Sequence, residues 1–215
     1  MNLLARHRKY RKNHISNFKG LDLIIHSDVF DPSLTNVSDI LADEIMINQG
    51  DIVLDMFTGS GALGFLAAKK ASCVIGVDLS KQAITCAKEN AIRLGLENKT
   101  EFRLGYLWSA ISEFERFNTI IANPPLLPVY PEDTLEMAIA DSPDMTLTID
   151  FLGGCASHLK RNGRVFMTFS NACSVFVGDP EEFIKKIAIN CGFEIKIKAT
   201  KEVGYEKYRV LEFRN

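Results

Sequence analysis

Residues 51–64 have the sequence Asp-Ile-Val-Leu-Asp-Met-Phe-Thr-Gly-Ser-Gly-Ala-Leu-Gly, and this stretch decides the fold of the 215-residue chain. Its apolar run, residues 52–54, predicts a short buried strand that ends on a carboxylate, Asp55. Glycines at 59, 61 and 64 follow, and residues 65–70 then have the character of a helix. Because glycine leaves room for a ligand, the stretch predicts a strand, a tight turn and a helix around a binding site.

The composition is ordinary for a globular protein, with 47% apolar and 24% charged residues, and predicts one α/β domain. No apolar run approaches the roughly 18–20 residues of a membrane span, and the N-terminus lacks the apolar core of a secretory signal. The five cysteines are odd in number and lack metal-ligand spacing. We therefore expect a cytoplasmic protein with reduced thiols, no metal site and no membrane contact.

The net charge of −2 hides an asymmetry along the chain. Residues 1–21 contain no acid and six bases, which are Arg6, Arg8, Lys9, Arg11, Lys12 and Lys19. Residues 1–16 are thus predicted to be a basic N-terminal extension, with a short helix over residues 2–13, and residues 17–215 to be the folded domain. Such an arm can contact RNA, a ribosome or an acidic protein, and a solvated helix face is the alternative interpretation.

The pattern of apolar segments predicts an α/β fold with a doubly wound, mostly parallel seven-stranded sheet and an antiparallel last strand. The seven expected strands of the sheet span residues 52–54, 72–77, 100–104, 118–122, 164–169, 193–199 and 208–213, and the last two form a hairpin around Gly204. Residues 21–25 are expected to form a further strand. One expected helix is capped at Asn36 or Ser38 and another at Ser80, and the others begin at residue 65, near Met145 and at Pro180.

Two ligands compete for the glycine turn. Gly59 to Gly64 match G-x-G-x-x-G, and Asp78 follows nineteen residues after Gly59, which is the spacing of a dinucleotide site. Asp55 argues against a dinucleotide, because a carboxylate there repels a pyrophosphate but suits the sulfonium and ammonium groups of S-adenosylmethionine. Asp78 can accept the ribose hydroxyls of either cofactor. A turn that only allows close packing of helix and strand is the third interpretation.

A second motif, Asn123-Pro124-Pro125-Leu126, follows the strand at residues 118–122 and predicts the chemistry. The Asn123 side-chain oxygen and a proline carbonyl can accept both hydrogens of an amino or amide NH2 group. Holding those hydrogens points the nitrogen lone pair at a methyl donor, so the motif favours an in-line displacement driven by positioning. A plain turn that ends the strand is the alternative.

In these motifs the chain resembles class I S-adenosylmethionine-dependent methyltransferases of the small-methyltransferase (HemK-like, Asn-Pro-Pro-Tyr motif) family. That group includes release-factor glutamine N5-methyltransferases and ribosomal and transfer RNA N-methyltransferases. The resemblance covers roughly residues 17–213 and rests on Phe18-x-Gly20, residues 29–32 (Val-Phe-Asp-Pro), residues 54–61, residues 76–78 and residues 123–128. It implies a Rossmann-like fold, so that residues 17–215 are the methyltransferase domain.

The resemblance also implies roles for individual residues. The cofactor site comprises Asp55, Phe57, Thr58, Gly59, Ser60, Gly61, Asp78, Leu79, Tyr106, Leu107 and Asn123. The catalytic and acceptor site comprises Asn123, Pro124, Pro125 and Leu126. Tyr106 occupies the place where the family often has an aspartate on the adenine amino group, and Trp108 is expected either on the adenine ring or in the core.

The expected activity is N-methylation of an amide or amino nitrogen, with a release-factor glutamine as the leading acceptor. RNA methylation through the basic arm, a small-molecule acceptor and a non-catalytic binding protein are the alternatives. Leu126 departs from the usual aromatic residue, which would stack on a planar amide or base. Short enzymes of this type include some that need a small zinc-binding activator subunit. The acids between residues 127 and 144 are interpreted as a solvated lid.

Overall fold

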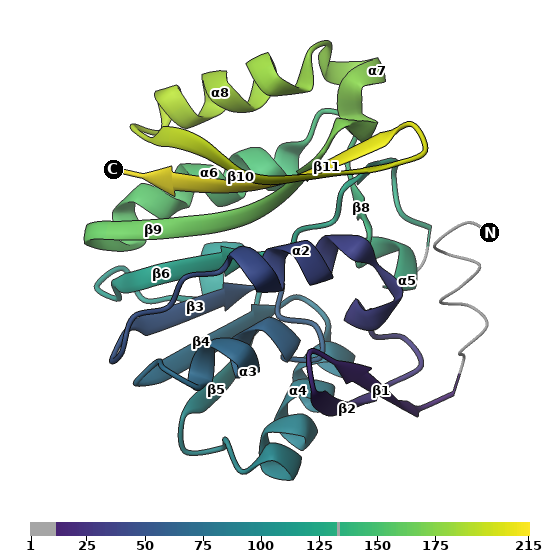
Figure 1. Ribbon diagram of the computed structural model, residues 1–215, viewed down its shortest axis with the longest axis vertical. Helices are drawn as coiled ribbons and strands as arrows, with labels where there is room; N and C mark the ends of the chain where they lie inside the picture. The colour runs from purple at the N-terminus through teal and green to yellow at the C-terminus, as the bar shows by residue number, and fades with distance from the viewer. Residues whose placement is uncertain (1–11, 133) are drawn as a thin grey trace.

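The computed structural model describes residues 12–132 and 134–215. Its centre is a seven-stranded sheet in the order β10-β11-β9-β6-β3-β4-β5 (Figure 1). The strands are β3 (Ile52–Met56), β4 (Cys73–Asp78), β5 (Thr100–Leu104), β6 (Phe117–Ala122), β9 (Leu159–Ser170), β10 (Glu194–Val203) and β11 (Glu206–Arg214). Only β11 runs antiparallel to its two neighbours, β9 and β10. The predicted doubly wound fold with an antiparallel last strand is confirmed.

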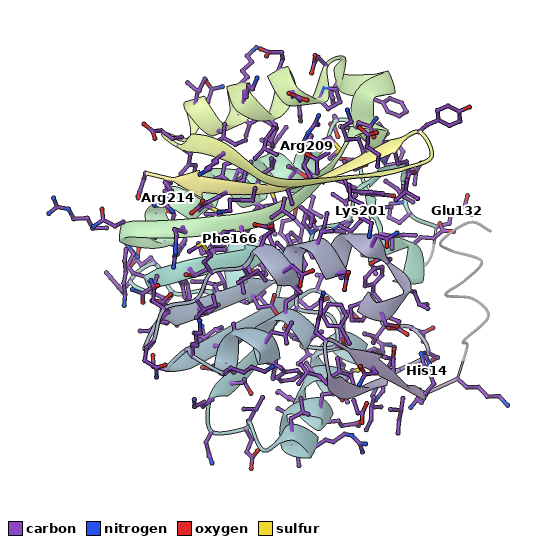
Figure 2. All side chains as sticks on the ribbon, viewed as in Figure 1. His14, Glu132, Phe166, Lys201, Arg209 and Arg214 are labelled. Carbon is purple, nitrogen blue, oxygen red and sulfur yellow. The ribbon has the colours of Figure 1, made fainter. Side chains whose placement is uncertain are left out.

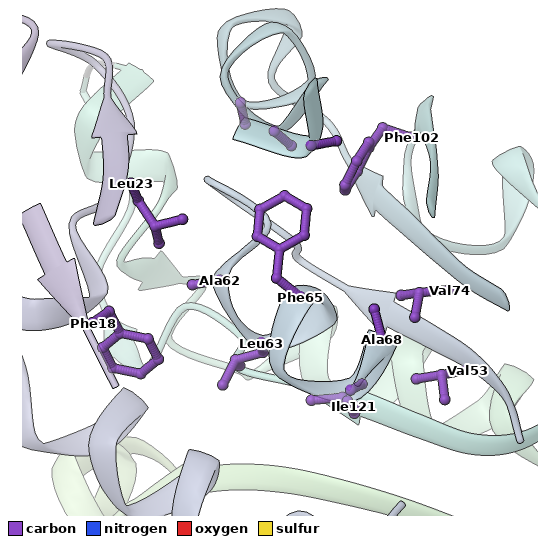
Figure 3. Close-up of a cluster of buried hydrophobic side chains, with 14 of the residues drawn as sticks. Phe18, Leu23, Val53, Ala62, Leu63, Phe65, Ala68, Val74, Phe102 and Ile121 are labelled. Carbon is purple, nitrogen blue, oxygen red and sulfur yellow. The ribbon is translucent and has the colours of Figure 1, made fainter. Parts of the chain in front are cut away.

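Helices cover both faces of this sheet, as Figure 1 shows. One layer consists of α2 (Asn36–Glu44), α3 (Ala62–Ala68) and α4 (Lys81–Leu94), and the other includes α6 (Thr146–His158) and α8 (Pro180–Asn190). Phe65 of α3 lies in the first core, where its ring meets that of Phe102 edge to face at 5.8 Å (Figure 3). Phe151 of α6 anchors the second core on the opposite face.

Local signals placed most helix ends correctly. Ser80 caps α4 by accepting from Ala83 N, and Gly95 ends that helix in the left-handed region. The cap of α2 differs from the prediction: the N-cap is Thr35, whose hydroxyl accepts from Ser38 N, and not Asn36 or Ser38. Several short elements were not expected: η1 (Pro32–Leu34), η2 (Leu107–Ala110), η3 (Asn171–Cys173) and α7 (Ser174–Val177).

The N-terminal part of the described chain is a hairpin of β1 (His14–Phe18) and β2 (Leu21–Ile25). The strand at residues 21–25 was predicted, but β1 was not, and the boundary expected between residues 16 and 17 falls inside it. His14 at its start, labelled in Figure 2, is hydrogen-bonded to Asp31 Oδ2 at 3.0 Å. Most of the helix expected over residues 2–13 lies outside the described residues.

The loop after β6 is more ordered than the lid that was expected. It contains α5 (Thr134–Met137) and a parallel pair of short strands, β7 (Leu127–Pro128) and β8 (Ala140–Asp141). Asp141 is 2% exposed and accepts hydrogen bonds from Leu147 N and Thr148 N at the start of α6. The interpretation as a solvated acid is therefore wrong for Asp141, whereas Glu132 lies exposed at the surface (Figure 2).

All five cysteines are free thiols, and three of them are buried. No helix in residues 12–132 and 134–215 is long and apolar enough to cross a membrane. In the same residues, no group of His, Cys, Asp and Glu side chains is arranged to hold a metal ion.

Candidate functional site

A cavity of about 510 Å³ opens where β3, β4 and β6 end at their carboxyl termini, the usual ligand position in this architecture. Most of the predicted site residues line it: Phe57, Thr58, Gly59, Ser60, Asp78, Leu79, Tyr106, Leu107, Asn123, Pro124, Pro125 and Leu126. Asp55 and Gly61 do not line it. The structure thus brings together two motifs that lie about sixty residues apart in the sequence.

The glycine turn is an unusual piece of backbone. Phe57, Gly59 and Gly61 all have positive φ values, of 63°, 53° and 88°. For a phenylalanine this left-handed conformation costs about 1–2 kcal/mol, so the surrounding contacts must stabilise it. The Phe57 ring packs against Phe151 with 5.7 Å between centroids, and Thr58 N donates to Val77 O. A Cβ at Gly61 would lie 2.5 Å from the Phe65 ring, so only glycine fits there.

Asp55 lies behind the turn and not in the cavity. Its Oδ2 accepts from Thr58 Oγ1 at 2.7 Å and from Gly64 N at 3.0 Å, and its Oδ1 has no hydrogen-bond partner. Burial raises the pKa of Asp55 to about 7, against the two hydrogen bonds that favour the charged form. The sequence suggested that Asp55 contacts a cofactor cation directly. The side chain does not line the cavity and therefore does not make that contact.

The observed position of Asp55 behind the turn still affects which ligand the turn can bind. Gly64 N belongs to the first turn of α3, where orphan N–H groups and the helix dipole attract anions. In a dinucleotide site a pyrophosphate takes those groups. Here the Asp55 carboxyl group accepts from one of these N–H groups, Gly64 N, inside the fold. This helix end is therefore less able to bind a diphosphate.

Asp78 fastens the other side of the turn and faces the cavity. Its Oδ2 accepts from Gly59 N and its Oδ1 accepts from Ser80 N, both at 2.9 Å. Burial raises the pKa of Asp78 above its ordinary value, and these backbone donors oppose that shift. Each carboxylate oxygen has a further lone pair, so Asp78 can accept hydroxyl groups of a ligand without losing its backbone contacts.

We call the part of the cavity around the glycine turn and Asp78 the cofactor half. Apolar and aromatic side chains line its far end. Leu79 and Tyr106 are about half exposed and line the cavity, as expected. Trp108 does not line it, because its ring stacks on His158 at 4.7 Å and its Nε1 donates to the carbonyls of Asp150 and Phe151. Of the two interpretations of Trp108, packing within the fold is the observed one.

Asn123 is held by hydroxyl groups on both sides of its amide. Its Oδ1 accepts from Thr168 Oγ1 at 2.8 Å, and its Nδ2 donates to Ser38 Oγ at 3.1 Å. Ser38 Oγ lies in turn 3.1 Å from Thr35 Oγ1. Ser38 and Thr168 are both fully buried. This arrangement leaves Oδ1 one lone pair for a ligand and fixes the direction in which it points.

Sequence reasoning missed these two holders of Asn123, and it also missed Glu206 and Tyr208, which line the cavity from the terminal hairpin. None of the four carries a motif. The pairing of β9 with β6 brings Thr168 next to Asn123, and the pairing of β9 with β11 adds the hairpin. A register prediction for the sheet could have found Thr168, Glu206 and Tyr208, whereas Ser38 is brought to Asn123 by the packing of α2.

Comparison with known families gives one clear match. Residues 47–203 match the family described as "Methyltransferase domain", which is well over half of the chain. That region contains the glycine turn, Asp78, the Asn-Pro-Pro motif and the strands that align them.

Among curated proteins, the chain is 26% identical over 203 residues to one from Methanocaldococcus jannaschii named "Putative protein N5-glutamine methyltransferase". The alignment covers 92% of this chain and 97% of that protein. The chain is also 40% identical over 97 residues to the release factor glutamine methyltransferase of Deinococcus radiodurans. There the match covers 44% of this chain and only 34% of the relative, so the two differ greatly in length.

Among solved structures, the fold matches that of a 16S rRNA N2 G1207 methyltransferase from T. thermophilus in complex with AdoMet and guanosine. The TM-score is 0.70 at 18% identity, covering 95% of this chain and 50% of that one. At this identity the likeness supports the fold alone.

Proposed function

The chain belongs to the methyltransferase domain family, and from this premise we propose that it methylates an amide or amino nitrogen, with a protein glutamine as the acceptor. S-Adenosylmethionine is the methyl donor of this class of enzyme. Residues 17–215, together with the rest of β1, would form the methyltransferase domain. The free thiols are consistent with action in the cytoplasm.

The residues present fit this cofactor. The cavity has the size of a small-molecule site, which is roughly 300–1,000 Å³. Asp78 offers carboxylate lone pairs for a ribose, and Leu79 and Tyr106 offer apolar surface for a base. Gly59 and Ser60 line the cavity where the methionine portion would be bound.

The geometry of Asn123 is the observation that carries the proposal. Its amide is fixed between two buried hydroxyls, and it lines the same cavity as Asp78. Holding an amide at both ends reduces the rotamer freedom that it would lose on binding an acceptor, which is the benefit of a preorganised site. A plain strand-ending turn would not need that arrangement.

The role of these residues in transfer follows from their hydrogen-bonding capacity. When bound, S-adenosylmethionine supplies an electrophilic methyl group on a sulfonium. The free lone pair of Asn123 Oδ1 accepts one hydrogen of the acceptor NH2, and the Pro124 carbonyl accepts the other. Neither Pro124 nor Pro125 has a backbone N–H that would compete for those acceptors. The nitrogen lone pair is then directed along the line of attack.

RNA is the second candidate acceptor, supported by the basic composition of residues 1–21. An RNA acceptor would give a methylated product that is sensitive to ribonuclease. Binding of RNA to the protein would weaken steeply with salt when the basic arm is present. A small activator subunit, which the resemblance implies for some short enzymes of this type, is a further proposal. Co-purification of a small zinc-binding protein, together with a gain of activity on its addition, would support it.

The test is transfer of a labelled methyl group to cell extract by the wild-type protein and by Asn123→Ala. We expect label in protease-sensitive material with the wild type and its loss in Asn123→Ala. Binding of S-adenosylhomocysteine, measured by calorimetry, should stay within about threefold in the variant because Asn123 acts on the acceptor. A fully active Asn123→Ala enzyme would contradict the role given to this residue.

A further inference from the structure

We propose that the acceptor is a peptide segment that carries a basic residue near the methylated side chain, and that Glu206 of the terminal hairpin binds this residue. The inference rests on the proposed function, because it names the substrate class of the same cavity. It goes beyond that function by assigning a second subsite to β11 and a charge to the sequence around the acceptor.

The first observation is that Glu206 and Tyr208 lie on the same face of the sheet as the holder of Asn123. Tyr208 is paired with Ser170, and Val210 is paired with Thr168. Side chains two residues apart on a strand share a face, and so do directly paired residues. Glu206, Tyr208, Ser170 and Thr168 therefore form one continuous surface that leads to Asn123.

This surface lines the cavity at the acceptor end. Asn123, Ser170, Glu206 and Tyr208 all contribute to its wall. Tyr208 Oη donates a hydrogen bond to Glu206 Oε2. Burial and the Glu206 carboxylate both raise the pKa of Tyr208, so its phenol stays protonated as a donor. The Glu206 carboxylate is thus oriented by a neutral partner that leaves its charge uncompensated.

The second observation concerns the cations of the hairpin, which contact other groups. Lys207 Nζ is paired with Glu202 Oε1 at 3.0 Å, and Lys201 Nζ, labelled in Figure 2, donates to Asn36 Oδ1 at 2.9 Å. Within residues 12–132 and 134–215, no lysine, arginine or histidine side chain forms an ion pair with Glu206, whose side-chain hydrogen-bond partner is Tyr208. A ligand group with a positive charge or several N–H donors would supply the missing partner.

The third observation is the charge of the cavity as a whole. Among the described residues that line it, the acids are Asp28, Asp78 and Glu206, and the one base is Lys81. Lys81 follows Ser80 at the cofactor end. A wall of this sign disfavours the phosphates of a nucleic acid and favours a basic segment, since contacts to phosphate need lysine or arginine.

The spacing of the two subsites matches an extended peptide better than a single amino acid. Strand geometry places Glu206 roughly 10–14 Å along the sheet from the Asn123 end, at about 3.3 Å per residue. An extended acceptor segment would then place its basic residue about three or four positions from the methylated glutamine. Val203 and the fully exposed Tyr205 flank Glu206 at the hairpin tip and offer apolar surface to such a segment.

The experiment uses the full chain, labelled S-adenosylmethionine and glutamine peptides that carry Lys, norleucine or Glu at each of four positions on either side. We expect the best Lys peptide to exceed its Glu counterpart about five- to tenfold in kcat/KM, the effect of one well-placed charge pair. Glu206→Gln should abolish this preference, and Glu206→Lys should reverse it. Glu202→Gln, which removes a charge from the same hairpin outside the cavity, should leave the preference unchanged.

The outcomes separate this inference from the proposed function. Methylation of all peptides at equal rates, or a preference that persists in Glu206→Gln, would overturn the inference alone. No peptide methylation, with ribonuclease-sensitive label in extract or with a labelled metabolite, would overturn the protein acceptor and the inference together. Binding of S-adenosylhomocysteine to the Glu206 variants verifies that the fold and the cofactor half are intact.

Discussion

Thr168 Oγ1 donates a 2.8 Å hydrogen bond to Asn123 Oδ1, although the two residues lie 45 positions apart in the sequence. Ser38, from the other side, accepts from Asn123 Nδ2. The two contacts determine which amide atom faces which neighbour, because Oδ1 can only accept and Nδ2 can only donate. Orientation of the residue proposed to hold the acceptor is therefore a property of two distant, fully buried hydroxyls.

Replacement of Thr168 by valine removes this donor with almost no change in volume. We expect kcat to fall about ten- to a hundredfold, because the amide can then rotate away from its productive direction. The affinity for S-adenosylhomocysteine should stay within about threefold, since Thr168 does not line the cofactor half of the cavity. Thr168→Ser keeps the hydroxyl and should restore most of the activity. Loss of cofactor binding in Thr168→Val would instead point to a general structural role.

How much of the structure could be predicted depends on how far apart in the sequence the interacting residues lie. The turn at residues 57–61 and the Ser80 and Gly95 ends of α4 were predicted, because each depends on neighbours within a few residues. The partners of Asn123 could not be predicted, because Thr168 depends on sheet register and Ser38 on the packing of α2. Asp55 was assigned to the cofactor site, yet it binds Gly64 N and Thr58 Oγ1 from behind the turn. A motif identifies the residue, but packing decides which way the side chain points.

Asp78→Asn is expected to weaken cofactor binding more than turnover. An asparagine can accept from only one of the two backbone groups, Gly59 N and Ser80 N, and its NH2 group would face the other. We expect the affinity for S-adenosylhomocysteine to fall about ten- to a hundredfold in calorimetry, with kcat at saturating cofactor within about fivefold. A variant with unchanged affinity would show that Asp78 is not part of the cofactor site.

Asp55 should make the stability of the protein depend on pH. Its pKa is about 7 in the folded protein and about 4 in the unfolded chain, so between these values only the folded state keeps the proton. The folded state therefore loses stability as pH rises from about 4 to about 7, by an amount on the order of 4 kcal/mol.

Asp55→Asn removes this titration. In urea unfolding, the stability of the wild type relative to Asp55→Asn should be greater at pH 5 than at pH 8. Thr58→Val is the control, because it removes a hydrogen bond that favours the charged form and should move the transition to higher pH. A wild-type-minus-variant difference that is constant with pH would exclude a raised pKa at Asp55.

Asn90 connects three segments around the glycine turn and gives the last prediction. Its Oδ1 accepts from Ile24 N at 2.7 Å, and its Nδ2 donates to Ile24 O at 2.8 Å and to Ser60 O at 3.1 Å. The side chain is fully buried on α4. It thereby joins the first hairpin to the turn that lines the cavity, a role that resembles a backbone pairing more than a surface contact.

Asn90→Ala leaves those backbone groups without their partner, and groups of this kind cost about 1–3 kcal/mol when buried and unpaired. We expect urea unfolding to show a loss of about 2–3 kcal/mol and calorimetry to show weaker binding of S-adenosylhomocysteine, because Ser60 is no longer held. Asn17→Ala is the matched control, since the exposed Asn17 bonds only within its own hairpin, to Asp22 and Gly20. If both variants lost stability equally, the effect would belong to the hairpin and not to its attachment to the turn. If Asn90→Ala lost stability but kept full cofactor affinity, the turn would hold its shape through Asp55 and Asp78 alone.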